Sequence, residues 1–418
     1  MFKRLNRIYH EFPSKFWVVV LVSFIDRIGG TLLFPFFSLY ITQKFKIGMT
    51  QAGIILGILS AFGLVGSMIG GALTDRFGRR RLILFGLIFS AISTLTLGLA
   101  NTLAALYPLI VVIGLLSNIA GPAQDAMIAD ILPEKQRAEG FGILRVAGNM
   151  AWIIGPTIGG IVAARSFFLL FVIDCVLSCI VAVLFYKLIP ETKPSASAEK
   201  SDETVWQTVA GYRHVLRDFA FMAFLAASIL MLAVYQQMYN TLPVYFRDTH
   251  GFSPSAYGFF LTTSAITVVL FQFWVTRQIK HRSPFLMMAL GTVFYAIGFS
   301  LIGLVSAYVL FLLASVVITI GEMIMMPTSQ ALAANFAPVE MRGRYMAVFG
   351  LSWAVPAMIG PGAGGWILDN FNPNWLWYGG GVLCIISALS FCFLHFRLGK
   401  QERFADKSEK DILPEPAA

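Results

Sequence analysis

The chain contains an internal repeat at an offset of 205 residues, and two membrane-sized segments align across it without a gap. The segments run over 111–160 and 316–365. Among the identical pairs are Val111 and Val316, Val112 and Val317, Ile113 and Ile318, Pro122 and Pro327, Ala126 and Ala331, Ala129 and Ala334, Pro133 and Pro338, Arg137 and Arg342, Gly155 and Gly360, Pro156 and Pro361, Gly159 and Gly364, and Gly160 and Gly365. Such a repeat in a strongly apolar chain is typical of secondary transporters built from two homologous halves.

Twelve apolar runs, each suited to a bilayer span of about 20 residues, account for most of the chain. Only 13% of the residues are charged, whereas a soluble protein of this length carries about 25%. Unpaired backbone amides are not tolerated in lipid, so we expect helices rather than an open sheet. The sequence therefore predicts an all-α membrane protein with 12 transmembrane helices. The runs lie at about 16–41, 51–73, 82–100, 104–128, 140–163, 167–188, 219–243, 255–276, 285–303, 307–330, 344–368 and 375–396.

The lysines and arginines set the expected orientation. If both termini lie in the cytoplasm, most of the 31 fall in cytoplasmic segments, which is the positive-inside bias. The net charge of +9 then reflects topology and contact with anionic lipids, and no nucleic acid is expected as a partner. The first apolar run, from Phe16, is too long for a signal-peptide core, so we expect it to remain in the mature protein.

The polar stretch between the halves marks the expected domain boundaries. We expect an N-terminal six-helix bundle over 1–188, a cytoplasmic linker over 189–217, a C-terminal six-helix bundle over 218–398 and a cytoplasmic tail over 399–418. The linker contains the Pro- and Ser-rich run PETKPSASAEKSDET, which is typical of a flexible connection.

The loop between the second and third runs combines glycines, an acid and several arginines. Gly78 permits a tight turn and the arginines can anchor in the phosphate layer, but an anchor alone does not explain Asp75. This loop resembles motif A of the major facilitator superfamily in the spacing of its glycines, acid and arginines. The resemblance implies the major facilitator fold, with two pseudo-symmetric six-helix bundles, and a conformational latch that stabilises the outward-facing state. The implied latch residues are Gly71, Asp75, Arg76, Gly78, Arg79 and Arg80, with Asp130 as acidic partner.

The fifth run carries a proline flanked by glycines. A proline within a span removes a backbone hydrogen bond and kinks the helix, and glycine admits a close neighbour. The segment resembles motif C, which is characteristic of the exporters of the superfamily, chiefly drug/proton antiporters, although a purely structural kink is equally compatible with these residues. The motif residues are Gly148, Gly155, Pro156, Gly159 and Gly160. The fourth run departs from the antiporter pattern, because Ser117 stands where motif B has an arginine.

Ionisable residues within the spans are expensive and are usually functional. The resemblance to multidrug antiporters, which have a Gly-Glu pair in span ten, implies that Glu322 carries the coupling proton. The alternative is a buried acid that is hydrogen-bonded across helices. Asp26 is a second candidate for proton coupling, or else a partner in an ion pair. Arg145 and Asn149 are one helical turn apart and either line the path or satisfy Asp125.

The resemblance also implies that spans one, four, seven and ten line a substrate cavity. Amide, aromatic and methionine side chains can repack around varied amphipathic molecules, although methionines at helical spacing also serve plain packing. No arginine pair or ring of carboxylates indicates a dedicated phosphate or dicarboxylate site. The predicted cavity residues are Arg27, Thr31, Phe34, Asn118, Tyr235, Gln236, Tyr239, Asn240, Met325 and Met326.

These features predict a secondary active transporter that exports small amphipathic or drug-like compounds in exchange for protons. A sugar-like metabolite symporter or facilitator and a lysolipid transporter remain open alternatives. An intramembrane enzyme is disfavoured, because the five histidines lie in loops or near span ends and no metal-ligand or nucleotide-binding motif occurs. We expect no cofactor and no metal. The expected partners are a small-molecule substrate, protons and membrane lipids, and the expected state is a monomer in a bacterial cytoplasmic membrane.

Overall fold

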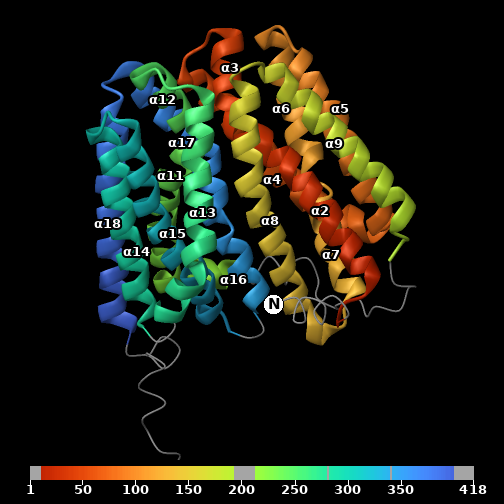
Figure 1. Ribbon diagram of the computed structural model, residues 1–418. Helices are drawn as coiled ribbons and strands as arrows, with labels where there is room; N and C mark the ends of the chain where they lie inside the picture. Colours follow the sequence, from red (N-terminus) through yellow and green to blue (C-terminus); the bar gives the residue numbers. More distant parts are fainter. Residues whose placement is uncertain (1–10, 193–211, 280–281, 339–340, 400–418) are drawn as a thin grey trace, which may run out of the picture. The chain divides into compact units, whose positions relative to one another are not determined.

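The computed structural model describes residues 11–192, 212–279, 282–338 and 341–399, and these residues form helices without any strand (Figure 1). Most of the predicted linker and nearly all of the predicted tail lie outside the described residues. The helices are α2 (Ser14–Leu33), η1 (Phe34–Phe36), α3 (Phe37–Phe45), α4 (Met49–Phe77), α5 (Arg79–Leu99), α6 (Leu103–Ser117), α7 (Gly121–Ile131), α8 (Glu134–Ala163), α9 (Phe167–Leu188), α11 (Phe219–Asn240), α12 (Leu242–His250), α13 (Pro254–Ile279), α14 (Pro284–Leu304), α15 (Tyr308–Phe336), α16 (Arg342–Phe349), α17 (Leu351–Asn370) and α18 (Asn374–Leu398).

The described helices include 12 candidate membrane spans, which confirms the predicted number. Each predicted run overlaps one of them, and the sixth coincides with it over Phe167–Leu188. The spans are Ser14–Phe45, Met49–Gly71, Arg79–Leu99, Leu103–Ile131, Glu139–Ala163, Phe167–Leu188, Phe219–Asn240, Pro254–Ile279, Pro284–Leu304, Tyr308–Phe336, Arg342–Asn370 and Asn374–Leu398. Large apolar side chains such as Phe273 and Leu270 are exposed on these helices, as lipid-facing surfaces require.

A proline interrupts the fourth span but not its repeat counterpart, the tenth span. The first span breaks at Pro35, and the fourth breaks between α6 and α7, just before Pro122. Proline lacks an amide hydrogen, so a helix tends to end or bend there. Pro327, the repeat partner of Pro122, instead lies inside the continuous helix α15. The two halves therefore share sequence but differ in local backbone geometry.

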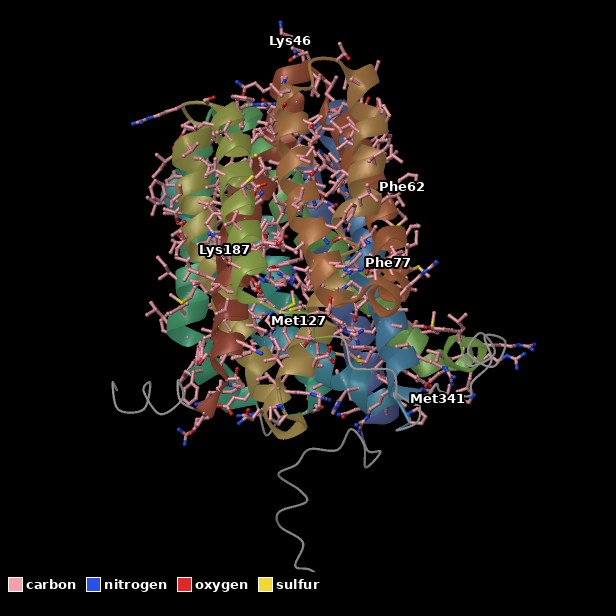
Figure 2. All side chains as sticks on the ribbon, turned by 90° about the vertical axis from the view of Figure 1, so that its right-hand side faces the viewer. Lys46, Phe62, Phe77, Met127, Lys187 and Met341 are labelled. Carbon is pink, nitrogen blue, oxygen red and sulfur yellow. The ribbon has the colours of Figure 1, made fainter. Side chains whose placement is uncertain are left out.

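The chain divides into two compact units, which differ slightly from the sequence halves. Unit 1 contains span one, most of spans two to six, and Phe246–Thr262. Within it α2 packs against α8 and α9, and α5 packs against α9. Its main apolar cluster includes Phe16, Val19, Met127 and Phe185. Lys46, at the end of α3, projects beyond the helices (Figure 2).

Unit 2 contains Gly48–Gly53 together with spans seven to twelve apart from the start of span eight. In it α14 lies beside α15 and α18 (Figure 1), and α11 packs against α17 and α18. The first turn of α4 belongs here because Asp369 of α17 holds it. The Asp369 carboxylate accepts hydrogen bonds from the amides of Met49 and Thr50, at 2.9 and 2.7 Å. These are amides that have no partner within their own helix.

Candidate functional site

Unit 1 contains a polar cavity of about 350 Å³. Helices α2, α7 and α8 supply its walls, so its residues come from spans one, four and five. The cavity is lined by Ser23, Asp26, Arg27, Gln124, Asp125, Ile128, Phe141, Leu144, Arg145, Gly148, Asn149 and Trp152. We call this site the polar cavity. Four of these residues are ionisable, which is a high density at membrane depth.

Arg27 lies close to both aspartates of the polar cavity. Its guanidinium lies near enough to interact electrostatically with both Asp26 and Asp125. Gly148 of α8 lies beside it, and a Cβ there would make only ordinary contacts, 3.4 Å from the Arg27 Cδ and 3.5 Å from Nη1. The position that resembles the start of motif C therefore lies beside the arginine of span one.

Arg145 faces the same cavity, and among the described residues no hydrogen bond or ion pair engages its side chain. Asp125 and Asn149 likewise lack a direct hydrogen bond or ion pair within the described part of the chain. Arg27 and Arg145 therefore line one cavity, an arrangement that was not expected from the sequence. Arg27 and Arg145 are far apart in sequence, and only the packing of α2 against α8 places them around one cavity.

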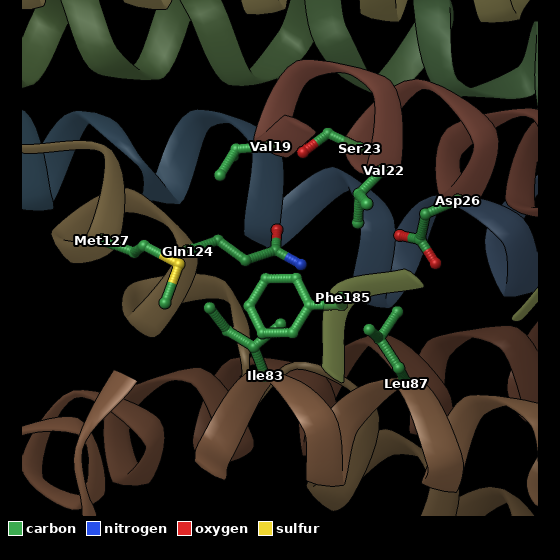
Figure 3. A pocket seen from close by; sticks show the side chains of 9 residues that line it. All are labelled: Val19, Val22, Ser23, Asp26, Ile83, Leu87, Gln124, Met127 and Phe185. Carbon is green, nitrogen blue, oxygen red and sulfur yellow. The ribbon is translucent and has the colours of Figure 1, made fainter. Parts of the chain in front are cut away.

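Asp26 also borders a smaller cavity of about 10 Å³, which has room for about one water molecule (Figure 3). Asp26 interacts electrostatically with another acid, Asp174 of α9. The Asp174 carboxylate is buried and accepts a hydrogen bond of 2.8 Å from the Thr94 hydroxyl. It also packs directly against Gly29, one turn after Asp26 on α2. Two carboxylates therefore lie close together inside unit 1.

Unit 2 holds a different arrangement around Glu322 of α15. The phenol groups of Tyr235, Tyr239 and Tyr295 all lie close enough to interact electrostatically with the Glu322 carboxylate. Tyr235 is within hydrogen-bonding reach of it, and its hydroxyl is 3.0 Å from that of Tyr239. We call these four residues the Glu322 site.

Tyr295 of α14 was not predicted as a site residue. Its ring stacks on that of Tyr235, with centroids 5.5 Å apart. Its hydroxyl is buried and has no hydrogen-bond partner among the described residues. No local sequence signal distinguishes Tyr295 from other span tyrosines, because its proximity to Glu322 arises only from the packing of α14 on α15.

The other predicted cavity residues occupy varied surroundings. Thr31 is buried and donates hydrogen bonds to the carbonyl oxygens of Arg27 and Ala151, at 2.7 and 3.0 Å. Phe34 is exposed, and Asn118 follows the last residue of α6. Asn240 donates to the Gln236 carbonyl. Met325 is fully buried against Thr292, whereas Gln236 and Met326 are half-buried.

The remaining glycines of the motif C segment lie at close helix contacts in unit 1. Gly155 packs against Thr31, and Gly159 packs against the carbonyl of Leu32. Gly160 contacts the backbone at Gly258, where a Cβ would lie 3.1 Å from Cα. Pro156 lies inside the uninterrupted helix α8, and its carbonyl abuts Gly258. These glycines allow helix backbones to approach closely.

The predicted latch lies between α4 and α5. The Arg79 Nε donates a hydrogen bond of 3.0 Å to the Asp130 carboxylate. Arg80 donates to the carbonyl of Tyr186 at 2.6 Å and stacks over its ring. Gly78 has a φ of +90°, which side chains rarely adopt. A Cβ added to Gly71 would have no atom within 4 Å. Arg76 lies over the Phe77 ring. The Asp75 side chain lies outside the described part of the chain.

Glu191 completes this turn and was missed by the sequence reasoning, which assigned it to the linker. Its carboxylate accepts hydrogen bonds from the amides of Arg79 and Arg80, at 3.0 and 3.4 Å. It therefore caps the N-terminus of α5, where a negative charge is favoured. The available signal was an acidic residue, Glu191, shortly after the end of the sixth span. No local sequence pattern indicates that it pairs with α5.

A family model described as Major Facilitator Superfamily matches residues 19–361 and 246–416. The chain belongs to the major facilitator superfamily. Together with the 12 candidate spans, membership confirms the predicted fold and makes the chain a multi-pass integral membrane transporter.

Relatives of this major facilitator protein carry different functions in their names. It is 26% identical over 357 residues to the "Na(+), Li(+), K(+)/H(+) antiporter" of Planococcus maritimus, which covers 79% of this chain and 84% of the relative. It is 25% identical over 396 residues to "Multidrug resistance protein MdtH" of Shigella flexneri, covering 92% and 94%. A solved POT family transporter with a bound thioalcohol-conjugated peptide superimposes with a TM-score of 0.79 at 18% identity, covering 93% and 97%, and shows the fold alone.

Proposed function

We propose that this transporter exports small amphipathic or drug-like compounds in exchange for protons, with Glu322 carrying the coupling proton. The observation that carries the proposal is the Glu322 site, where a membrane-depth carboxylate lies among three tyrosines. An isolated charge at the bilayer centre costs roughly 2.5–3.5 kcal/mol on insertion scales. Such a carboxylate is retained where its charge is used.

The tyrosines suit a group that alternates between protonated and ionised forms. Tyr235 can donate to the ionised carboxylate, and the unpartnered hydroxyl of Tyr295 offers a second donor. Hydrogen bonds to the ionised form favour it, whereas burial favours the neutral acid. Because these effects oppose each other, a cationic substrate that binds beside Glu322 can shift the equilibrium between its ionised and protonated forms. We therefore expect substrate and proton to compete for Glu322 during alternating access.

The driving force would be the proton gradient across a bacterial cytoplasmic membrane, with both termini in the cytoplasm. One charge moving through 100 mV releases about 2.3 kcal/mol. Asp26, beside Asp174, is the second candidate for a coupling proton. The antiporter and multidrug relatives are consistent with this exchange but lie too far in sequence to identify its substrate. We expect a monomer that needs only substrate, protons and lipids.

The proposal is tested by proton movement in proteoliposomes that contain the full chain. A pH-sensitive dye inside the vesicles reports proton flux when tetraphenylphosphonium, ethidium or sodium is added. We expect a lipophilic cation to drive proton flux in the opposite direction, and Glu322→Gln to abolish that flux. Glu139→Gln makes the same chemical change at an exposed residue and should retain it.

Four outcomes would contradict the proposal. Flux of protons in the same direction as substrate would indicate a symporter, and substrate movement without protons would indicate a facilitator. Full coupling in Glu322→Gln would exclude this residue as the proton carrier. A response to sodium alone would instead support cation/proton exchange of the kind named for the Planococcus maritimus relative.

A further inference from the structure

We infer that the polar cavity of unit 1 binds the two charged ends of a zwitterionic substrate, with Arg27 and Arg145 at its acidic group and Asp125 at its cationic group. The inference rests on the proposed transport function and deepens it by naming a substrate class. It concerns other residues than the Glu322 site, which belongs to unit 2 and contains no cation among the described residues.

The first argument is the charge left open in the cavity. Arg27 lies near both Asp26 and Asp125, so its single positive charge is shared by two carboxylates. Arg145 reaches the same cavity without a hydrogen bond or ion pair among the described residues. Charged groups at membrane depth normally pair with each other or line a water-filled path for a solute. The open cation is therefore available for an anionic group of the substrate.

The second argument is the balance of charge. The two arginines and two aspartates of the polar cavity sum to zero formal charge. A solute with only a negative charge would leave Asp125 without a partner, and a simple cation would leave Arg145 without one. A zwitterion satisfies both signs without adding net charge. This class differs from the simple lipophilic cations that the Glu322 site alone would favour.

The third argument is the shape of the binding groups. A guanidinium presents a planar fork of donors that matches a carboxylate, and Arg27 and Arg145 approach from two different helices. Asn149, one turn from Arg145 on α8, adds an amide that can donate or accept. Phe141, Leu144 and Ile128 supply an apolar wall for the uncharged part of the solute. The volume of about 350 Å³ falls in the range of small-molecule sites.

The test compares probes that share one skeleton and differ only in charge. The purified full chain in lipid nanodiscs is titrated with phenylalanine, its amide and its N-acetyl derivative, which are a zwitterion, a cation and an anion. The dipeptide phenylalanyl-alanine and its two capped forms make a second, larger series. Affinity is measured by calorimetry and by the rise in melting temperature. In at least one series we expect the zwitterion to bind at least tenfold more tightly than either capped form.

Single substitutions then assign the two ends. Arg145→Gln should weaken binding of the zwitterion by about tenfold or more, because a charged hydrogen-bonding partner of its carboxylate is lost. The affinity for the amide should not change. Asp125→Asn should weaken the zwitterion and leave the N-acetyl derivative unchanged. Arg145→Lys keeps the positive charge but lacks the forked donors of the guanidinium, so its affinity for the zwitterion should lie between those of the wild type and Arg145→Gln. Arg165→Gln, at an exposed arginine outside the cavity, should match the wild type.

The outcomes separate this inference from the proposed function. No binding by either zwitterion, or equal binding by a capped form, overturns the inference even if lipophilic cations still exchange for protons. Zwitterion binding that is unaffected by Arg145→Gln and Arg145→Lys also overturns it. Zwitterion binding with the expected substitution pattern, but without proton movement through Glu322, supports the cavity and contradicts the coupling scheme.

Discussion

Gly29 and Gly30 are neighbours on α2 with opposite surroundings. A Cβ on Gly29 would overlap the Asp174 carboxylate, whereas a Cβ on Gly30 would have no atom within 4 Å. Only the first glycine is required by packing, and it brings a buried acid of α9 against the helix that carries Asp26 and Arg27. The close approach of Asp174 to the helix that carries Asp26 and Arg27 therefore depends on a glycine at position 29.

We expect Gly29→Ala to destabilise the protein by about 1–3 kcal/mol, because the added methyl group must displace Asp174 or separate the helices. Gly30→Ala should be neutral or slightly stabilising, since alanine favours a helix by up to about 1 kcal/mol over glycine. Thermal unfolding of the purified protein in detergent measures both. Equal melting temperatures for the two variants would contradict the packing argument.

Tyr295 offers a second prediction at the scale of single residues. Removing its unpartnered hydroxyl in Tyr295→Phe leaves the ring stacked on Tyr235 but removes one donor near Glu322. The ionised carboxylate loses stabilisation, so we expect the pH profile of proton-coupled transport to shift upward with little change in melting temperature. Tyr378→Phe serves as a control, because its hydroxyl donates to Gly303 and none of its contacts involves Glu322. An unshifted profile would exclude a role for Tyr295.

At the scale of elements, the start of α5 depends on a residue more than 100 positions away in sequence. Glu191 accepts from two of the first amides of α5, while Gly78 turns the chain with a φ of +90° and leaves room for that carboxylate. Arg79 and Arg80 then reach α7 and α9 through Asp130 and the Tyr186 carbonyl. The turn, the cap and the arginines form one structural element.

Loss of this cap is testable. Glu191→Gln should destabilise the start of α5 by about 0.5–2 kcal/mol, the usual range for removing a helix cap. Amide hydrogen exchange at Arg79 to Arg81 should accelerate, with little change at the far end of the helix. Glu139→Gln is the control at an exposed glutamate. Unchanged exchange at these amides would show that the cap contributes nothing.

At the scale of the whole molecule, the two compact units do not follow the sequence repeat throughout. Each unit takes in a short segment from the other half of the sequence, Gly48–Gly53 in one case and Phe246–Thr262 in the other. Close glycine contacts explain the first exchange, because a Cβ on Gly53 or Gly365 would overlap the backbone of α17 or α4. The sequence repeat therefore reflects the common ancestry of the two halves better than it predicts which segments pack together.

The orientation proposed for the whole chain makes its own prediction. In a cysteine-free background, Lys46→Cys should react with a membrane-impermeant maleimide added to intact cells, since Lys46 follows the first span. Lys187→Cys, at the end of the sixth span, should react only after the membrane is permeabilised. The opposite pattern of labelling would place the termini outside.

The sequence by itself determined the number and positions of the spans, because hydrophobic length and the hydrogen-bonding needs of the backbone in lipid are local properties. It also marked Glu322, Asp26 and Arg27, since ionisable residues stand out in apolar runs. Their neighbours were decided by tertiary structure. Arg145 shares a cavity with Arg27, and Tyr295 lies beside Glu322, because helices distant in sequence pack together, and no local pattern records which faces meet.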